Sequence, residues 1–240
     1  MSDINEYNVL GGFIGLDEFI LLEIASDLID LEDIQQLVCL NKKTFKLKDH
    51  IRFHKAIENK INIPISITVP EGDYIKKEDE FTYISTKDEF KTFPIDKQIS
   101  HGIYRCEFKN NNNVNVFGVM KSGLVIPFGR GCGVQPYCKD NAYYNNQRKY
   151  ITQNGKEIGV KQESKHGDTV AIEVNMTHPR TATFFVNGKQ LPVFVSNLPE
   201  SVQFFFFLYS KDESVTILSL KRLEAPTATN IPDAKEMKWE

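Results

Sequence analysis

The chain has 240 residues, of which 41% are hydrophobic and 25% are charged. This length predicts one large domain, or a small domain followed by a medium-sized one, and the apolar fraction excludes global disorder. The formal net charge of −3 argues against nucleic acid as the main partner, because phosphate binding requires a clear basic excess on one face.

The sequence carries no signal for a membrane or for secretion. No run of about 18 apolar residues occurs, so no membrane-spanning helix is predicted. Lys42 is the first basic residue, so the basic start of a secretory signal peptide is missing. Four cysteines in a chain of this length do not indicate a disulfide framework. We therefore expect a cytoplasmic protein with reduced thiols.

Residues 1–62 are predicted to form a small three-helix segment. Leu16, Ile20, Ile24 and Leu28 recur every four residues, which is typical of an amphipathic helix. Ile34 belongs to a second short helix, for which Asp30 is the candidate N-cap, and a third helix is predicted within residues 45–61. Three short helices enclose only a small core, so we expect a partner or a neighbouring domain to stabilise them.

The charges of this segment are divided along the sequence. Residues 1–41 contain nine acidic residues and no basic one, whereas residues 42–60 contain seven basic and two acidic residues. Two solvated helix faces that attract each other would give the same pattern, so the division alone does not identify a binding surface.

Residues 63–224 are predicted to form a β domain. Pro64 ends the helical pattern, and strand-like runs follow at residues 103–108, 114–120, 169–174 and 181–186. Asn154-Gly155 and Asn187-Gly188 favour tight hairpin turns, and the apolar run 204–207 suits a central strand covered on both faces. The predicted fold class is mainly β, an antiparallel β-sandwich. Residues 225–240, rich in Pro, Thr and Ala and then charged, are expected to form a mobile tail.

Residues 72–223 resemble a SPRY domain, which has a concanavalin-like β-sandwich fold. Five segments follow the order of the family. They are His-Gly-Ile-Tyr-Arg-Cys-Glu-Phe at 101–108, Val-Phe-Gly-Val-Met at 116–120, Gly-Asp-Thr-Val at 167–170, Thr-Phe-Phe-Val-Asn-Gly-Lys at 183–189, and Asn-Leu-Pro at 197–199 with the strand 204–209. Where the family often has Trp or Tyr-Gly-Tyr in its middle strand, this chain has Asn-Ala-Tyr-Tyr at 141–144. The resemblance implies a non-catalytic domain that binds another protein.

Residues 16–57 resemble an F-box. Leu16-Asp17 stands where the family has Leu-Pro, Asp33-Ile34 stands for its Asp-Leu pair, and the family's Trp is missing. The resemblance implies docking on the adaptor of a cullin–RING ubiquitin ligase through Leu16, Ile20, Ile24, Leu28, Ile34, Leu40 and Lys42. The alternative is a helical segment that only braces the sandwich of a stand-alone SPRY interaction module.

No pattern for catalysis, a cofactor or a metal is found. The β region has no closely spaced cysteine pair and no paired histidines of the kind that bind zinc. The glycine-rich residues 129–133 are not followed by the Gly-Lys-Ser/Thr of a phosphate-binding loop, and no Gly-x-Ser-x-Gly elbow occurs. We therefore expect neither an enzyme nor a bound cofactor.

Two loops of the sandwich are the candidate target-binding surface. Recognition residues on a sandwich usually lie on loops, and arginine and tyrosine often anchor interfaces. SPRY domains bind partner peptides with loops placed like residues 128–144 and 209–212. The resemblance therefore implies a target-binding role for Arg130, Gln135, Tyr137, Tyr209, Ser210 and Lys211. A third possibility is a carbohydrate-binding sandwich in which Tyr137 or Tyr143 stacks on a sugar.

Overall fold

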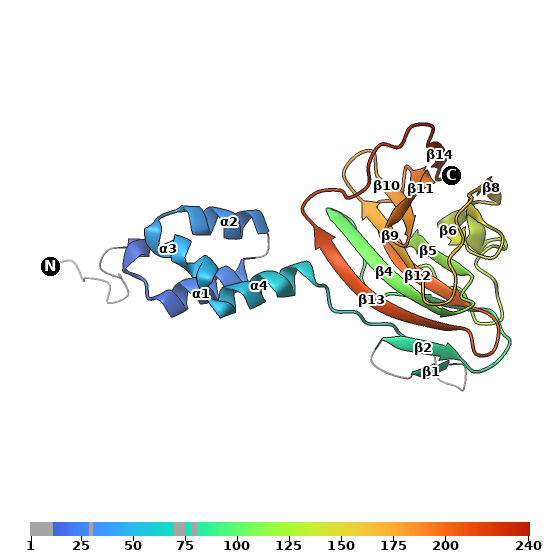
Figure 1. Ribbon diagram of the computed structural model, residues 1–240, viewed down its shortest axis with the longest axis horizontal. Coiled ribbons are helices and arrows are strands. Elements are labelled where there is room, and N and C mark those ends of the chain that lie inside the picture. Colours follow the sequence, from blue (N-terminus) through green and yellow to red (C-terminus); the bar gives the residue numbers. More distant parts are fainter. Residues whose placement is uncertain (1–11, 29–30, 70–74, 78–80) are drawn as a thin grey trace. The chain divides into compact units, whose positions relative to one another are not determined.

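The computed structural model describes residues 12–28, 31–69, 75–77 and 81–240. It divides into two compact units, Met1–Ile63 and Pro64–Glu240 (Figure 1). The first unit is helical and the second is a β-sandwich, which confirms the predicted fold class.

Four α-helices form the described part of the first unit: α1 (Glu18–Asp27), α2 (Leu31–Cys39), α3 (Lys42–Lys46) and α4 (Ile51–Ile61), with 3-10 turns η1 (Gly12–Gly15) and η2 (Leu47–Asp49). The single helix expected within residues 45–61 is therefore wrong. His50 has an extended backbone, and its ring nitrogen accepts the Arg52 N–H, so α4 begins anew after α3 and η2. Asp30, the candidate cap of the second helix, lies outside the described residues.

The helices enclose a small core of their own. Its buried members are Leu21, Leu22, Ala25, Ile34, Leu37, Leu47 and Phe53. The most deeply buried side chains of α1 are those of Leu21, Leu22 and Ala25. Of the predicted four-residue repeat, Ile24 is partly buried and Ile20 is exposed.

Two sheets form the second unit. The eight-stranded sheet has the order β1 (Ile75–Lys77), β2 (Thr82–Ser85), β13 (Ser214–Leu223), β4 (Ile103–Asn112), β9 (Thr169–Asn175), β10 (Thr181–Val186), β11 (Lys189–Ser196) and β14 (Lys235–Lys238). The six-stranded sheet has the order β3 (Lys91–Pro94), β12 (Val202–Leu208), β5 (Val116–Lys121), β6 (Asn141–Asn145), β7 (Tyr150–Gln153) and β8 (Lys156–Gly159). The 3-10 turn η3 (Tyr137–Asp140) leads into β6.

Both predicted hairpins are confirmed. Asn154 and Gly155 join β7 to β8, and Asn187 and Gly188 join β10 to β11. All four residues have positive φ, between 50° and 75°, as a type I′ turn requires. These turns therefore set the register in which the two strands of each hairpin pair.

Aromatic side chains fill the space between the two sheets. Phe108 of β4 contacts Phe117 of β5 at 5.3 Å between ring centroids, and Phe93 of β3 stacks on Phe206 of β12 at 5.1 Å. Every residue of β12 is buried, since the strand lies between β3 and β5 and both of its faces are covered. The predicted central strand at residues 204–207 is thus confirmed.

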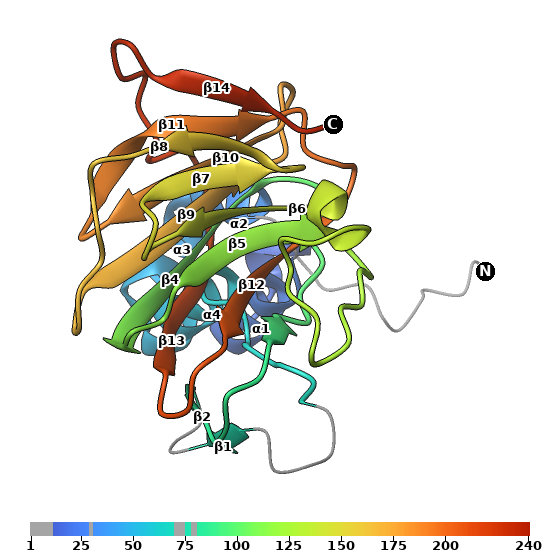
Figure 2. The same cartoon turned by 90° about the vertical axis from the view of Figure 1, so that its right-hand side faces the viewer.

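Residues 225–240 differ from the expected mobile tail. Residues 235–238 form β14, which pairs in parallel with β11 at the end of the eight-stranded sheet (Figure 2). The Met237 side chain of β14 is buried. This segment also contacts β9 on the outer face of the eight-stranded sheet. Ala171 and Glu173 on the outer face are buried, and the Thr227 and Ala228 N–H groups bond to Glu173.

Candidate functional site

The outer face of the six-stranded sheet carries a groove of about 550 Å³. Its lining comes from strands β5, β6, β7, β8 and β12 of this sheet, seen in Figure 2, and from segments that connect the strands. The groove lies within the sandwich unit alone.

The floor of the groove is aromatic and aliphatic. Val116, Tyr143, Tyr150 and Phe207 line it, one each from β5, β6, β7 and β12. Phe117, Tyr144 and Phe206 are their neighbours in sequence and are buried too, because strand side chains alternate and these point to the opposite face of the sheet. The floor residues belong to a second hydrophobic cluster that is separate from the helical core.

One wall is the segment between β5 and β6. Ile126 and Cys132 pack into the floor cluster, and residues 131–134 line the groove. The buried side chain of Asn141 fastens this wall by donating to the Cys132 and Tyr137 carbonyl oxygens, each at 2.8 Å. A Cβ on Gly133 would lie 2.5 Å from the Tyr143 hydroxyl, so glycine lets the wall close over that ring.

A second wall is the stacked pair of Phe90 and Tyr209, whose ring centroids are 4.7 Å apart. The two loops that carry these rings are each held by hydrogen bonds to a buried side chain. The ammonium of Lys91, which is fully buried, donates to the Lys87 and Glu89 carbonyl oxygens at 2.7 and 2.8 Å. The buried Glu213 carboxylate accepts the Tyr209 N–H and, at 3.2 Å, the Asn115 side chain.

Burial shifts the pKa of both of these anchoring groups. It lowers the pKa of the Lys91 ammonium and raises the pKa of the Glu213 carboxyl, because removal from water penalises each charged form. The N–H groups of Tyr209 and Ser210 oppose the shift of Glu213. The two loops are therefore held by groups that lost hydration on folding and regained hydrogen bonds from the chain.

The third wall is the β7–β8 hairpin with its polar side chains. Gln153, Asn154 and Glu157 line the groove there, while Asn145 and Arg148 line it nearby. The Gln153 amide donates to the Lys139 carbonyl oxygen at 3.0 Å, and Asn154 N–H donates to the Cys138 carbonyl oxygen at the same distance. The hairpin is thus tied to the wall formed by the β5–β6 segment.

Burial favours the protonated form of three groups in the groove, Cys132, Tyr143 and Tyr150. Burial raises the pKa of Cys132 to about 12, and burial also raises the pKa values of the Tyr143 and Tyr150 hydroxyls. A thiol in this state is a poor nucleophile. The arrangement offers an apolar floor with amide and hydroxyl groups around it, which suits the recognition of an extended chain.

The predicted target-binding residues do not form one cluster. Tyr209 lines the groove and is 42% exposed, whereas Arg130 and Gln135 are exposed but are not among the lining residues. Tyr137 is half-buried and packs against the floor cluster. Ser210 and Lys211 lie in the β12–β13 loop, where the Lys211 N–H donates to Asp88 at 2.7 Å.

Sequence reasoning did not find several residues of the groove. Phe90 lies in a short segment before β3 that carries no motif, and its pairing with Tyr209 depends on strands distant in sequence. Tyr150 and Gln153 follow from the predicted hairpin, but the sequence did not show that this hairpin lies beside the β5–β6 segment.

The residues predicted to dock on an adaptor are split between the core and the surface of the helical unit. Ile34 is 1% exposed and belongs to the core, and Leu16, Ile24 and Leu28 are partly buried against it. Ile20 and Leu40 are 48% and 62% exposed, and Lys42 is exposed as well.

Other apolar side chains of this unit reach the surface. Phe19 and Phe45 are more than half exposed. A hollow of about 420 Å³ lies between the end of α2 and α3 and is lined by Val38, Cys39, Asn41, Lys42, Phe45 and Lys46.

Within the described residues, no group of three or more His, Cys, Asp or Glu side chains is placed to hold a metal ion. In the same part of the chain, no helix is long and apolar enough to cross a membrane.

No family model matches the sequence, and no curated protein matches it either. Solved structures do match. The SPRY domain of human HERC1 is 15% identical, with a TM-score of 0.49 over 63% of this chain and 94% of that chain. The TRIM65 PSpry domain is 10% identical, with a TM-score of 0.49 over 64% of this chain and 88% of that chain. Stonustoxin is 14% identical, with a TM-score of 0.50 over 68% of this chain and 28% of that chain. At these identities the likeness concerns the fold.

Proposed function

We propose that the sandwich is a non-catalytic module that binds an extended segment of a target protein in the groove. The observation that carries this proposal is the preformed aromatic groove, with its Phe90–Tyr209 pair at one wall and amide side chains at the opposite one. Exposed aromatic rings beside hydrogen-bonding side chains are typical of protein interfaces. The resemblance of the sequence to SPRY domains supports the same function.

The carbohydrate alternative has less support. Tyr143 is 8% exposed and Tyr137 packs against the floor cluster, so neither presents an open ring face for a sugar to cover. The rings that remain accessible, Phe90 and Tyr209, already stack on each other.

We propose further that the helical unit docks on the adaptor of a cullin–RING ubiquitin ligase, so that the protein acts as a cytoplasmic target receptor. Ile20, Leu40 and Phe45 support this role, because large apolar side chains exposed on so small a unit favour a partner that covers them. Four cysteines, all free, support the cytoplasm as the compartment.

Affinity purification of the full chain followed by mass spectrometry tests both proposals. We expect a target protein together with adaptor and cullin peptides. Asp substitutions at Ile20 and Leu40 should remove the adaptor and cullin while the target remains, since both side chains are exposed. Leu218→Asp, in the exposed part of β13, is the matched control. Recovery of a target without any ligase subunit would reject the adaptor proposal and leave the stand-alone interaction module.

A further inference from the structure

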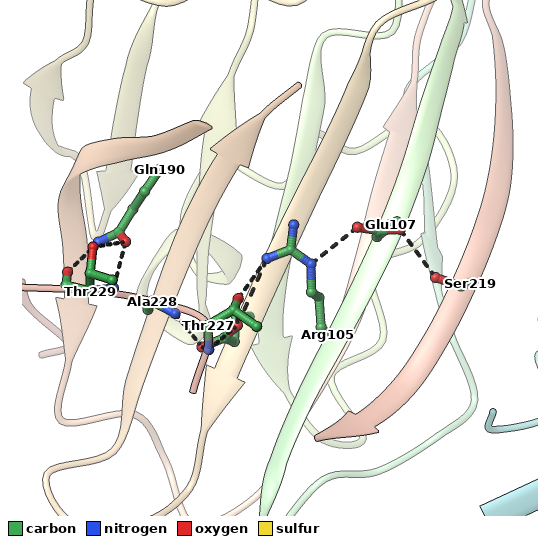
Figure 3. Close-up of polar contacts among 8 residues, drawn as sticks. Arg105, Glu107, Gln190, Ser219, Thr227, Ala228 and Thr229 are labelled. Atoms are coloured by element: carbon green, nitrogen blue, oxygen red, sulfur yellow. Dashed lines mark hydrogen bonds and ion pairs between the residues drawn. The ribbon is translucent and has the colours of Figure 1, made fainter. Parts of the chain in front are cut away.

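A second constellation lies on the outer face of the eight-stranded sheet, away from the groove. Glu173 of β9 is 2% exposed, and its carboxylate accepts hydrogen bonds from the Thr227 N–H at 3.0 Å and the Ala228 N–H at 3.0 Å. The Thr227 hydroxyl also bonds to this carboxylate (Figure 3). A buried carboxylate thus holds two successive main-chain N–H groups of residues 225–240, here called the C-terminal strap.

Arg105 of β4 completes this site. Its guanidinium lies 3.8 Å from the Glu173 carboxylate and donates to the Thr227 hydroxyl at 3.0 Å. The same group is oriented from behind by the Phe185 ring, 4.2 Å from its centroid, and by Glu107, which accepts its Nε–H at 3.1 Å. The receptor side chains therefore come from paired strands, and their orientation does not depend on the strap alone.

The next contact also involves the main chain of the strap. The Gln190 side-chain amide donates to the Thr229 carbonyl oxygen at 2.9 Å and accepts the Thr229 N–H at 2.8 Å, as Figure 3 shows. One glutamine thereby occupies both hydrogen-bonding groups of a single strap residue. The Thr229 hydroxyl donates to the same Gln190 oxygen at 3.4 Å, so the glutamine contacts the main chain and the side chain of this residue.

Further along, the strap adds a strand to the sheet. β14 pairs with β11 from Val193↔Lys235 to Ser196↔Lys238, and the Trp239 N–H donates to the Ser196 carbonyl oxygen at 2.9 Å. Met237 is 4% exposed and is the strap side chain most deeply buried. Strand addition at an open sheet edge is a common way of binding peptides, because the ladder supplies affinity and pockets for alternate side chains supply selectivity.

We propose that Glu173, Arg105, Gln190 and the edge of β11 form a second peptide-binding site. Its ligand class is an extended peptide with a Thr that precedes a short β-strand bearing one buried apolar side chain. The chain's own residues 226–239 are the resident ligand, held in place by tethering. The four receptor elements lie outside the groove lining, but the strap reaches the β7–β8 wall of the groove, where Glu240 exchanges hydrogen bonds with Gln153 and pairs with Lys156. The proposal does not depend on the adaptor proposal.

The test cleaves the link between the sandwich and the strap, and both pieces of the chain stay in the sample. A protease recognition sequence is inserted between Ala225 and Pro226, both exposed, and the chain is cleaved. Native mass spectrometry over a dilution series then gives the dissociation constant of the released fragment. We expect the fragment to remain bound after cleavage. Glu173→Gln should weaken it about tenfold or more, since hydrogen bonds to a charged acceptor are lost.

Glu163→Gln is the matched control. Glu163 is an exposed residue between β8 and β9 whose carboxylate pairs with Lys149 at 2.6 Å, so the same carboxyl-to-amide change there should leave the dissociation constant unchanged. Thr227→Val lies on the strap itself and cannot unfold the sandwich, and we expect about threefold to tenfold weaker binding from the lost hydroxyl. A fragment that leaves the unsubstituted protein on cleavage would overturn the proposal. Equal weakening by Glu163→Gln and Glu173→Gln, or unchanged binding in Thr227→Val, would also overturn it.

Discussion

The rings of Phe90 and Tyr209 stack at a wall of the groove, with an interplanar angle of 29°. Each ring stands on a loop anchored by a buried charged group, Lys91 for the first and Glu213 for the second. A wall held in this way is formed before a target arrives, so little conformational freedom is lost on binding.

Removing either ring should weaken target binding. We expect Phe90→Ala and Tyr209→Ala each to cost about 1–3 kcal/mol of binding free energy, the range of interface anchors. Calorimetry against the recovered target measures this, after the melting temperature of each variant has been checked. Leu218→Ala, an exposed side chain of the other sheet, is the control. Unchanged affinity in both ring variants would place the target elsewhere on the sandwich.

Arg130→Ala should have a smaller effect than Tyr209→Ala. Arg130 is exposed and outside the groove lining, and a solvated charge at the rim of an interface contributes about 0–1 kcal/mol. We expect a loss of target affinity that disappears at high salt, and binding titrations at low and high ionic strength measure it. A salt-independent loss as large as that of Tyr209→Ala would show that the β5–β6 segment carries the main anchor.

Gly118→Ala should destabilise the sandwich strongly. A Cβ at this position would lie 2.5 Å from the Phe205 ring and 2.6 Å from the Ala142 carbonyl oxygen, so β5, β6 and β12 would have to separate. We expect a loss of about 1–3 kcal/mol in the free energy of unfolding. Gly131→Ala is the control, because nothing lies within 4 Å of its Cβ. Chemical denaturation compares the two, and equal stabilities would contradict the packing described here.

Asp168 should make part of the stability dependent on acid pH. Its carboxylate accepts the Lys165 N–H at 2.7 Å, which lowers the pKa of Asp168, and the Asn187 side chain adds to the shift. A lowered folded-state pKa gives stability that is present above the unfolded pKa of about 4 and is lost as the pH falls through the folded value.

The comparison of wild type with Asp168→Asn tests this linkage. The difference in unfolding free energy between wild type and Asp168→Asn should be largest at neutral pH and should shrink below about pH 4. Denaturant titrations across this pH range measure it. A difference that stays constant on acidification would show that the Asp168 contact does not depend on its charge.

The sequence alone determined the features that depend on local geometry. Asn-Gly pairs accept positive φ, so the two tight turns could be placed at 154–155 and 187–188. An unbroken apolar run predicted that β12 would be covered on both faces. The order of strand motifs then led to the sandwich, because sheets with these patterns have few ways to bury their apolar faces.

Only the tertiary structure decided the two surfaces that we propose as binding sites. The stacking of Phe90 on Tyr209 depends on the pairing of β3 with β12, which no local pattern encodes. The strap looked mobile in sequence because it is rich in Pro, Thr and Ala, yet Glu173 and Gln190 bond to its main chain and to the Thr227 and Thr229 hydroxyls. In α1 the predicted repeat includes Ile20, which is exposed, while Leu21 and Ala25 are buried, since the packing of α1 against neighbouring helices selects the buried face. Contacts between distant segments fix these features, and a periodicity within one segment does not contain them.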